Sequence, residues 1–205
     1  MVVAELLLFA AIMALGQFSP GPDMILLTRT ALAAGGRIGS WTAAGIATGL
    51  SIHAALAVGG TAALLSRRGV PGEFARWLAA GCLGWLGFVL VRAAVRNQAA
   101  GLEAPAGFRA GRLAAWRRGL LCNLLNPKVA LFLAAAAAPF LAGKHPAWWP
   151  LAIWAIIVGQ GLALWVVWAW VLQAPAARRF YAGAARWIDA GFGLALWILA
   201  VRVLF

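Results

Sequence analysis

Two short polar segments interrupt this otherwise strongly apolar sequence, and each places a proline directly beside an ionisable residue. The first is Gln17-Phe18-Ser19-Pro20-Gly21-Pro22-Asp23, and the second is Asn123-Leu124-Leu125-Asn126-Pro127-Lys128. Proline lacks a backbone N–H donor and clashes with the preceding helical turn, so both segments are predicted to break a helix. Side chains at such breaks could bind a small polar molecule, and the candidate binding residues are Ser19, Pro20, Gly21, Pro22, Asp23, Asn123, Asn126, Pro127 and Lys128.

Asp23 and Lys128 are the most informative of these residues, because ionisable groups inside apolar segments are costly and usually functional. The partial positive charge at a helix N-terminus favours a carboxylate. We therefore expect Lys128 and Asn126 to receive the carboxylate of a substrate, and Asp23 with nearby carbonyl groups to receive an ammonium group. Two simpler alternatives stay open: Asp23 caps the half-helix that follows it, or Asp23 and Lys128 pair with each other.

The composition defines the elements that must position these residues. Of the 205 residues, 64% are apolar and 11% are charged, and the mean hydropathy is +0.90. A soluble domain is about half apolar and a quarter charged, so the chain is predicted to be an integral membrane protein. The apolar runs lack the strict alternation of a membrane barrel, which indicates an all-α fold. Six helical spans are predicted, at Val2–Phe18, Ile38–Leu65, Phe74–Val91, Leu113–Leu141, Ala147–Leu172 and Phe180–Phe205.

The net charge of +12 is interpreted mainly as a topology signal. With six spans, 11 of the 17 basic residues fall on one side of the membrane. The positive-inside rule assigns that side to the cytoplasm, so both termini are expected outside, although a five-span alternative stays open. Basic residues at the membrane surface could contact anionic lipids, whereas the pattern does not indicate a nucleic-acid partner.

The two breaks also divide the chain into corresponding halves. Residues 1–205 are interpreted as one transmembrane domain, in which a cytoplasmic linker (93–112) joins two three-helix repeats (1–92 and 113–205). If Pro22 is aligned with Pro127, each half begins with a broken helix: the first predicted helix in one half and the fourth in the other. The two halves then have opposite orientations in the membrane. Interrupted helices at matching positions of inverted halves are typical of a transporter binding site, and they predict alternating access around the breaks.

Other residues complete the chemical inventory. His53 and Asp23 are candidates for a proton relay, although a histidine in such a helix more often forms a hydrogen bond between helices. Gly45 and Gly49 are expected to allow close helix packing. Asp189 is interpreted as pairing with Arg186 near a span end. The sequence has 2 histidines and lacks nucleophile and phosphate-binding motifs, so neither an enzyme activity nor a metal or other cofactor is expected.

The same residues carry a family resemblance. Two ordered motifs and the overall length resemble the LysE/RhtB family of amino acid exporters. The first motif is Ser19-Pro20-Gly21-Pro22-Asp23-Met24 with Gly36-Arg37, Gly39, Gly45, Gly49 and His53, and the second is Gly119-Leu120, Asn123-Leu124, Asn126-Pro127-Lys128 and Leu131-Phe132. The resemblance implies a multi-pass bacterial inner-membrane exporter of amino acids or related small amines, driven by the proton motive force.

The sequence departs from that family in two places and leaves one rival function open. The family often has an aromatic-rich third span with a tyrosine, whereas this chain has Gly81-Cys82-Leu83-Gly84-Trp85-Leu86-Gly87 there. Phe140 follows Pro139 at a position where the family commonly has a glutamine. The particular amino acid and the coupling ion therefore stay open, as does the oligomeric state, with a homo-oligomer among the alternatives. The rival function is a membrane thiol–disulfide electron carrier that uses Cys82 and Cys122, although neither lies in a Cys-x-x-Cys motif.

Overall fold

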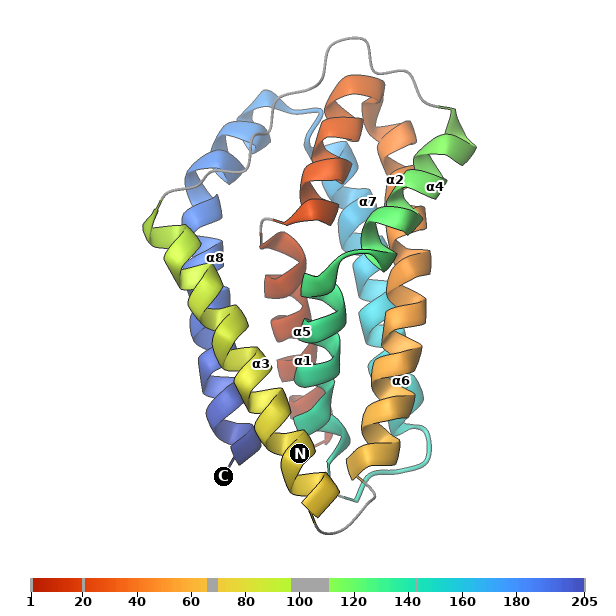
Figure 1. Ribbon diagram of the computed structural model, residues 1–205. Coiled ribbons are helices and arrows are strands. Elements are labelled where there is room, and N and C mark those ends of the chain that lie inside the picture. The colour runs from red at the N-terminus through yellow and green to blue at the C-terminus, as the bar shows by residue number, and fades with distance from the viewer. Residues whose placement is uncertain (1, 20, 66–69, 97–110, 143, 205) are drawn as a thin grey trace.

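The computed structural model confirms the all-α fold. It describes residues 2–19, 21–65, 70–96, 111–142 and 144–204. Nearly all of these residues are helical, and the helices pack side by side into one elongated bundle (Figure 1). In chain order the elements are α1 (Val2–Phe18), α2 (Pro22–Leu65), α3 (Val70–Val95), α4 (Arg112–Leu124), α5 (Pro127–Leu141), α6 (Trp149–Ala155), the π-helical turn η1 (Ile156–Gln160), α7 (Gly161–Val171) and α8 (Pro175–Leu204).

Helix α2 contains a reversal that the apolar pattern does not reveal. Its first limb continues in the direction of α1, and its second limb returns along the bundle (Figure 1). The change of direction occurs at Gly35, whose backbone has φ 81° and ψ 166°. Residues with a Cβ atom rarely adopt a positive φ, so glycine is the residue that permits this turn. The predicted second span, Ile38–Leu65, therefore corresponds to the returning limb of α2.

Both predicted helix breaks are confirmed. Helix α1 ends at Phe18 and α2 begins at Pro22, whereas Pro20 lies outside the described residues. Helix α4 ends at Leu124, and α5 leaves it at an angle of 59°. Proline starts each following helix, at a position where an N–H donor would have no intrahelical partner. The side chain of Asn126 caps α5 by accepting a hydrogen bond of 3.1 Å from the backbone N–H of Lys128.

Close contact between α2 and α4 brings the second break against the returning limb of α2. A Cβ atom added at Gly45 would overlap the carbonyl oxygen of Trp116, and one added at Gly119 would overlap that of Thr42. At Gly49, an added Cβ atom would lie 2.7 Å from Oδ1 of Asn123. The expectation that Gly45 and Gly49 allow close helix packing is therefore confirmed.

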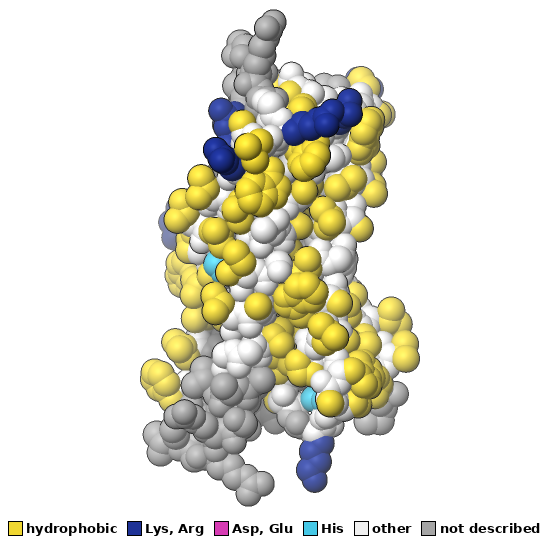
Figure 2. Space-filling view, turned by 90° about the vertical axis from the view of Figure 1, so that its right-hand side faces the viewer, with side chains coloured by type: hydrophobic (Ala, Val, Ile, Leu, Met, Phe, Trp, Pro, Cys, Tyr) yellow, Lys and Arg dark blue, Asp and Glu magenta, His cyan; other side chains and the backbone are white. Residues whose placement is uncertain are grey.

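The length and apolar composition of the helices identify some candidate membrane spans. Two helices in the described ranges, Pro22–Gly60 and Trp149–Val171, are long and apolar enough to cross a membrane. The bent pairs Arg112–Leu124 with Pro127–Leu141 and Pro175–Tyr181 with Arg186–Arg202 could each add one span. On the face shown in Figure 2, Lys and Arg side chains concentrate near one end of the bundle and apolar side chains cover its middle. The six-span arrangement and the inverted repeat stay predictions, and much of the predicted linker, residues 97–110, lies outside the described residues.

Candidate substrate-binding site

A buried pocket lies where the two helix breaks meet. The apolar core falls into two clusters, one containing Phe9, Phe132 and Phe192 and the other containing Met24 and Trp165, and residues of both clusters line the pocket. The cavity measures about 60 Å³. Its lining residues are Met13, Gly16, Gln17, Ser19, Gly21, Asp23, Met24, Leu50, Asn123, Asn126, Lys128, Val129, Phe132, Leu133, Ile157 and Trp165. The pocket therefore combines an apolar wall with polar groups from both breaks.

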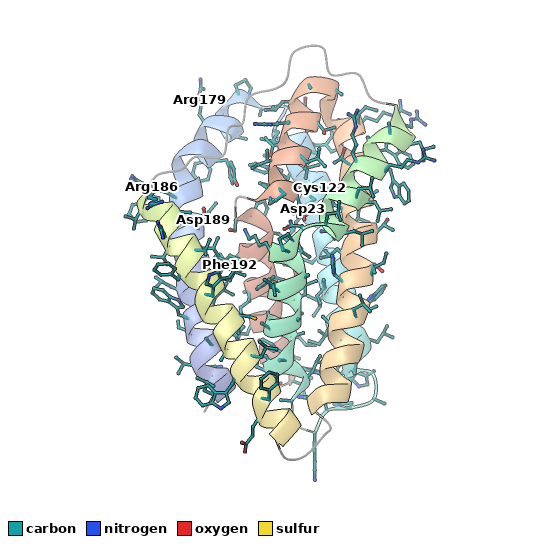
Figure 3. The ribbon with its side chains drawn as sticks, viewed as in Figure 1. Asp23, Cys122, Arg179, Arg186, Asp189 and Phe192 are labelled. Carbon is teal, nitrogen blue, oxygen red and sulfur yellow. The ribbon has the colours of Figure 1, made fainter. Side chains whose placement is uncertain are left out.

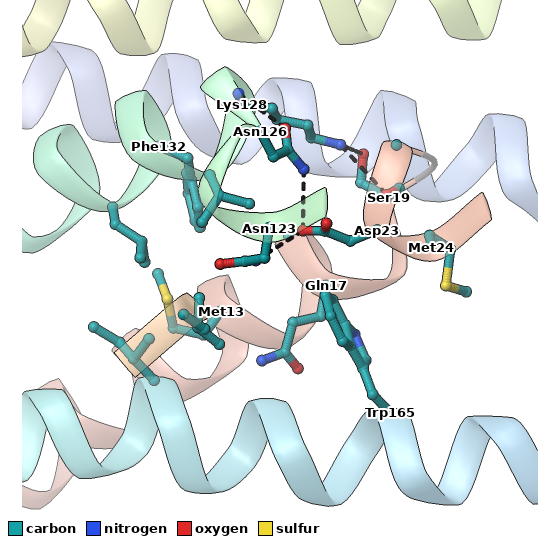
Figure 4. A pocket seen from close by; sticks show the side chains of 16 residues that line it. Met13, Gln17, Ser19, Asp23, Met24, Asn123, Asn126, Lys128, Phe132 and Trp165 are labelled. Atoms are coloured by element: carbon teal, nitrogen blue, oxygen red, sulfur yellow. Dashed lines mark hydrogen bonds between the residues drawn. The ribbon is translucent and has the colours of Figure 1, made fainter. Parts of the chain in front are cut away.

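Asp23 connects the first break to the second. Its side chain is only 4% exposed, and its Oδ2 atom accepts hydrogen bonds from Nδ2 of Asn123 at 2.9 Å and Nδ2 of Asn126 at 3.0 Å (Figure 4). The other carboxylate oxygen, Oδ1, is buried without a hydrogen-bond partner among the described residues. A buried carboxylate oxygen usually has a donor, so the Oδ1 atom of Asp23 is an unsatisfied acceptor in the pocket.

Lys128 and Ser19 connect the two breaks a second time. The Lys128 ammonium donates hydrogen bonds to Oγ of Ser19 at 2.7 Å and to the Ser19 carbonyl oxygen at 3.3 Å. The Ser19 hydroxyl in turn donates a hydrogen bond of 2.6 Å to Oδ1 of Asp189 in α8. The site therefore holds carboxylates from two helices and an ammonium group from a third.

The interpretation of Asp189 as a partner of Arg186 at a span end is wrong. Asp189 is buried and faces the first break, whereas Arg186 is exposed and lies over the ring of Trp187 (Figure 3). The sequence signal that could have identified Asp189 is a carboxylate within an apolar stretch, which usually faces the bundle interior rather than lipid.

The two carbonyl groups that lose a helical N–H donor to the prolines contact side chains of other helices, and the Asn123 carbonyl also accepts a hydrogen bond of 3.0 Å from the backbone N–H of Asn126. In an unbroken helix, the N–H groups at positions 22 and 127 would bond the carbonyls of Phe18 and Asn123, but proline has no N–H. The Tyr181 hydroxyl donates a hydrogen bond of 3.0 Å to the Phe18 carbonyl, and Nε2 of His53 lies 3.2 Å from the Asn123 carbonyl. His53 thus forms the interhelical hydrogen bond considered above, and its role in a proton relay stays a prediction.

Replacing Tyr181 with phenylalanine is expected to lower stability by about 1–3 kcal/mol, because the Phe18 carbonyl loses its donor inside the bundle. The ring itself packs edge-on against Trp168, with the ring centroids 4.7 Å apart, and phenylalanine keeps that packing. The thermal midpoint of the detergent-purified protein measures the effect, with Phe180→Leu at the exposed neighbouring position as a control. An unchanged midpoint for Tyr181→Phe would contradict the assignment of the Tyr181 hydroxyl.

The remaining candidate residues have varied positions. Gly21 lines the pocket, whereas Pro22 and Pro127 begin the half-helices and position their neighbours.

Both cysteines are free thiols: Cys82 packs against the core in α3, and Cys122 in α4 lies near Asp23 (Figure 3). Within the described ranges, His, Cys, Asp and Glu side chains form no group that could hold a metal ion. Trp165 of α7, which the sequence analysis did not identify as a site residue, also lines the pocket.

Broken helices that converge on a pocket with polar lining residues inside an apolar bundle are typical of a multi-pass membrane transporter. The chain belongs to the LysE type translocator family, whose family model matches residues 14–205. It is therefore a member of a transporter family rather than of an enzyme family.

Individual relatives cover most of the chain. The sequence is 28% identical over 188 residues to the threonine efflux protein of Escherichia coli (strain K12), covering 87% of this chain and 90% of that protein. It is also 28% identical to the uncharacterized membrane protein YahN of the same strain, covering 92% of this chain and 83% of that protein. A homoserine/homoserine lactone efflux protein of Salmonella typhi is 36% identical over 131 residues, which are 63% of this chain and 61% of that protein. No solved structure gives a significant match.

Proposed function

We propose that this protein exports small amino acids or related small amines across the bacterial inner membrane. The observation that carries the proposal is the buried Asp23 carboxylate, which has one oxygen without a hydrogen-bond partner among the described residues and lines a pocket with an apolar wall. A negative charge in that position suits the ammonium group that all these substrates share. The names of two relatives, a threonine efflux protein and a homoserine/homoserine lactone efflux protein, support amino acids as the substrate class.

Within this proposal, Asp23 binds the substrate ammonium, and Lys128 with Asn126 receives the substrate carboxylate. The hydrogen bonds from Lys128 to Ser19 support this role, because they hold the ammonium group at the wall of the pocket. Asn126 lines the same pocket and already donates to Asp23, so the two proposed subsites adjoin each other.

Alternating access would follow from six spans arranged as two inverted three-helix repeats, 1–92 and 113–205, with residues 93–112 as the cytoplasmic linker. The hydrogen bonds of Asp23 and Lys128 link one break to the other, which supports a site located between the proposed halves. Rocking of the halves would expose this site to each side of the membrane in turn. We propose the proton motive force as the energy source, with Asp23 and His53 as candidate proton-carrying residues.

Exchanging the charges tests whether Asp23 and Lys128 act on the substrate or only on each other. Asp23→Asn and Lys128→Met are each expected to lower export at least about tenfold, and the double variant Asp23→Lys/Lys128→Asp is not expected to recover it. In the wild-type protein the side-chain N–H groups of Asn123 and Asn126 donate to the Asp23 carboxylate. In the double variant they would face the ammonium group of a lysine, which is also a donor and cannot accept these hydrogen bonds. Recovery of export in the double variant would instead assign the two residues to a structural ion pair.

Metabolite profiling of cells and medium, with and without expression of the protein, tests the proposed function itself. Expression is expected to lower at least one amino acid or amine in the cytoplasm and raise it in the medium. A profile in which none of these compounds moves outward would refute export. A variant that lacks both cysteines is expected to export normally, whereas its complete loss of activity would favour the thiol–disulfide alternative.

A further inference from the structure

Unpaired polar atoms concentrate in the pocket. Among the residues that the structure describes, the buried side-chain atoms without a hydrogen-bond partner are Gln17 Oε1, Asp23 Oδ1, Asn123 Oδ1, Gln160 Oε1 and Trp165 Nε1. All of them except Gln160 Oε1 belong to residues that line this one cavity. Folded proteins leave few buried polar atoms unpaired, so such a concentration indicates a ligand that supplies the missing partners.

The unpaired atoms fall into two chemically different pairs. Asn123 is oriented by the hydrogen bond from its Nδ2 atom to Asp23, so its free atom is the acceptor Oδ1. Asp23 Oδ1 and Asn123 Oδ1 are both acceptors, and they suit an ammonium group with its several donors. Gln17 Oε1 and Trp165 Nε1 are different, because one is an acceptor and the other is a donor.

A hydroxyl group satisfies a donor and an acceptor at the same time. It can donate its hydrogen to the Gln17 oxygen while it accepts the indole N–H of Trp165. Figure 4 shows the Gln17 and Trp165 side chains together on one side of the pocket, with Asp23 and Asn123 on the other. The Gln17 side chain lies beside α7, where its amide nitrogen is 3.0 Å from the position that a Cβ atom on Gly161 would occupy.

We propose that Gln17 and Trp165 form a subsite for a side-chain hydroxyl of the substrate, so that the transporter selects small hydroxylated amino acids over their apolar isosteres. The inference rests on the proposed function and adds to it the two residues that distinguish a hydroxylated substrate from its apolar isostere. An isostere with a methyl group in place of the hydroxyl leaves both polar atoms of the subsite unpaired, which is how a hydrogen-bonding site rejects an analogue. The cavity of about 60 Å³ would admit roughly four to six water-sized groups, which favours a short side chain.

Threonine and valine test this subsite, because they differ by a hydroxyl in place of a methyl group. Purified protein is reconstituted into lipid vesicles loaded with one labelled amino acid or the other, and the initial rates of release are compared. The wild-type protein is expected to release threonine at least about tenfold faster than valine. Trp165→Phe and Gln17→Leu are each expected to lower this threonine-to-valine ratio by about three- to tenfold, the effect of one neutral hydrogen bond.

Trp168→Phe is the matched control for the tryptophan variant. Trp168 lies one helical turn from Trp165 in α7, but its Nε1 atom already donates a hydrogen bond of 3.2 Å to the Thr28 hydroxyl. Its substitution is therefore expected to leave the threonine-to-valine ratio unchanged, even if it lowers both rates. Thermal midpoints of all the variants separate loss of folded protein from loss of selectivity.

Each other outcome has a definite meaning. Equal release of threonine and valine by the wild-type protein would overturn the hydroxyl subsite while leaving amino acid export intact. Trp165→Phe and Gln17→Leu proteins that keep the wild-type threonine-to-valine ratio would also overturn it. The polar atoms of Gln17 and Trp165 would then bind water rather than a substrate hydroxyl. Wild-type vesicles that release no amino acid would refute the proposed function, and the subsite with it.

Discussion

Replacing Asp23 with asparagine is expected to lower amino acid export about ten- to hundredfold while the folded protein is retained. Asparagine has nearly the same size, but it removes the negative charge that the substrate ammonium would meet at Oδ1. A hydrogen bond to a charged group contributes about 1.5–3 kcal/mol, which corresponds to that range of rates or affinities. The measurement is the initial rate of export from cells preloaded with a labelled amino acid, normalised to the amount of protein in the membrane.

Glu73→Gln is the control for loss of a negative charge. Glu73 lies in the first turn of α3, where its side chain is exposed and does not line the pocket. Its neutral variant is expected to export at the wild-type rate. If Asp23→Asn exported as fast as Glu73→Gln, the carboxylate would not bind substrate, and its hydrogen bonds to the two asparagines would have a structural role only.

A single methyl group at Gly45 is expected to destabilise the whole bundle. In Gly45→Ala, the new methyl group would overlap the Trp116 carbonyl oxygen, which belongs to the backbone of α4 and cannot move without the helix. Overpacking costs about 1–3 kcal/mol, so the thermal midpoint is expected to fall by at least about 3 °C. Export is expected to fall with it, because α4 carries Asn123 to the pocket.

Gly59→Ala in the same helix provides the comparison. No heavy atom lies within 4 Å of the position that a Cβ atom at Gly59 would occupy, and alanine favours a helix more than glycine does. This variant is expected to keep or slightly raise the thermal midpoint. Equal midpoints for Gly45→Ala and Gly59→Ala would show that α2 and α4 do not meet as closely as their backbones indicate.

Much of the fold could be predicted because its signals are local. Apolar runs and prolines are properties of neighbouring residues, and they predicted α1 with the bounds Val2–Phe18 that the structure has. They also predicted both breaks, whereas the hydrogen bonds of Asp23 with Asn123 and Asn126 were not predicted. The reversal at Gly35 was harder to predict, because a positive φ leaves no mark on hydropathy.

The parts of the site that could not be predicted depend on tertiary contacts. Asp189 follows Arg186 at helical spacing, so a local interpretation paired them, but the packing of α8 turns the carboxylate toward Ser19. Trp165 is one of several tryptophans in α7, and only the packed structure separates it from Trp168, whose N–H is already bonded. Sequence spacing identifies which residues can break a helix, whereas the missing hydrogen-bond partners become visible only in three dimensions.

The central claim is that the pocket formed at the two breaks binds a small amino acid and carries it across the membrane. Counterflow of labelled threonine into vesicles that contain purified protein and excess unlabelled threonine tests this claim most directly. Wild-type vesicles are expected to accumulate label transiently above protein-free vesicles, and Asp23→Asn vesicles are expected to accumulate it about ten- to hundredfold more slowly than the wild type. Wild-type vesicles that accumulate no label, or Asp23→Asn vesicles that accumulate as much as the wild type, would contradict the claim.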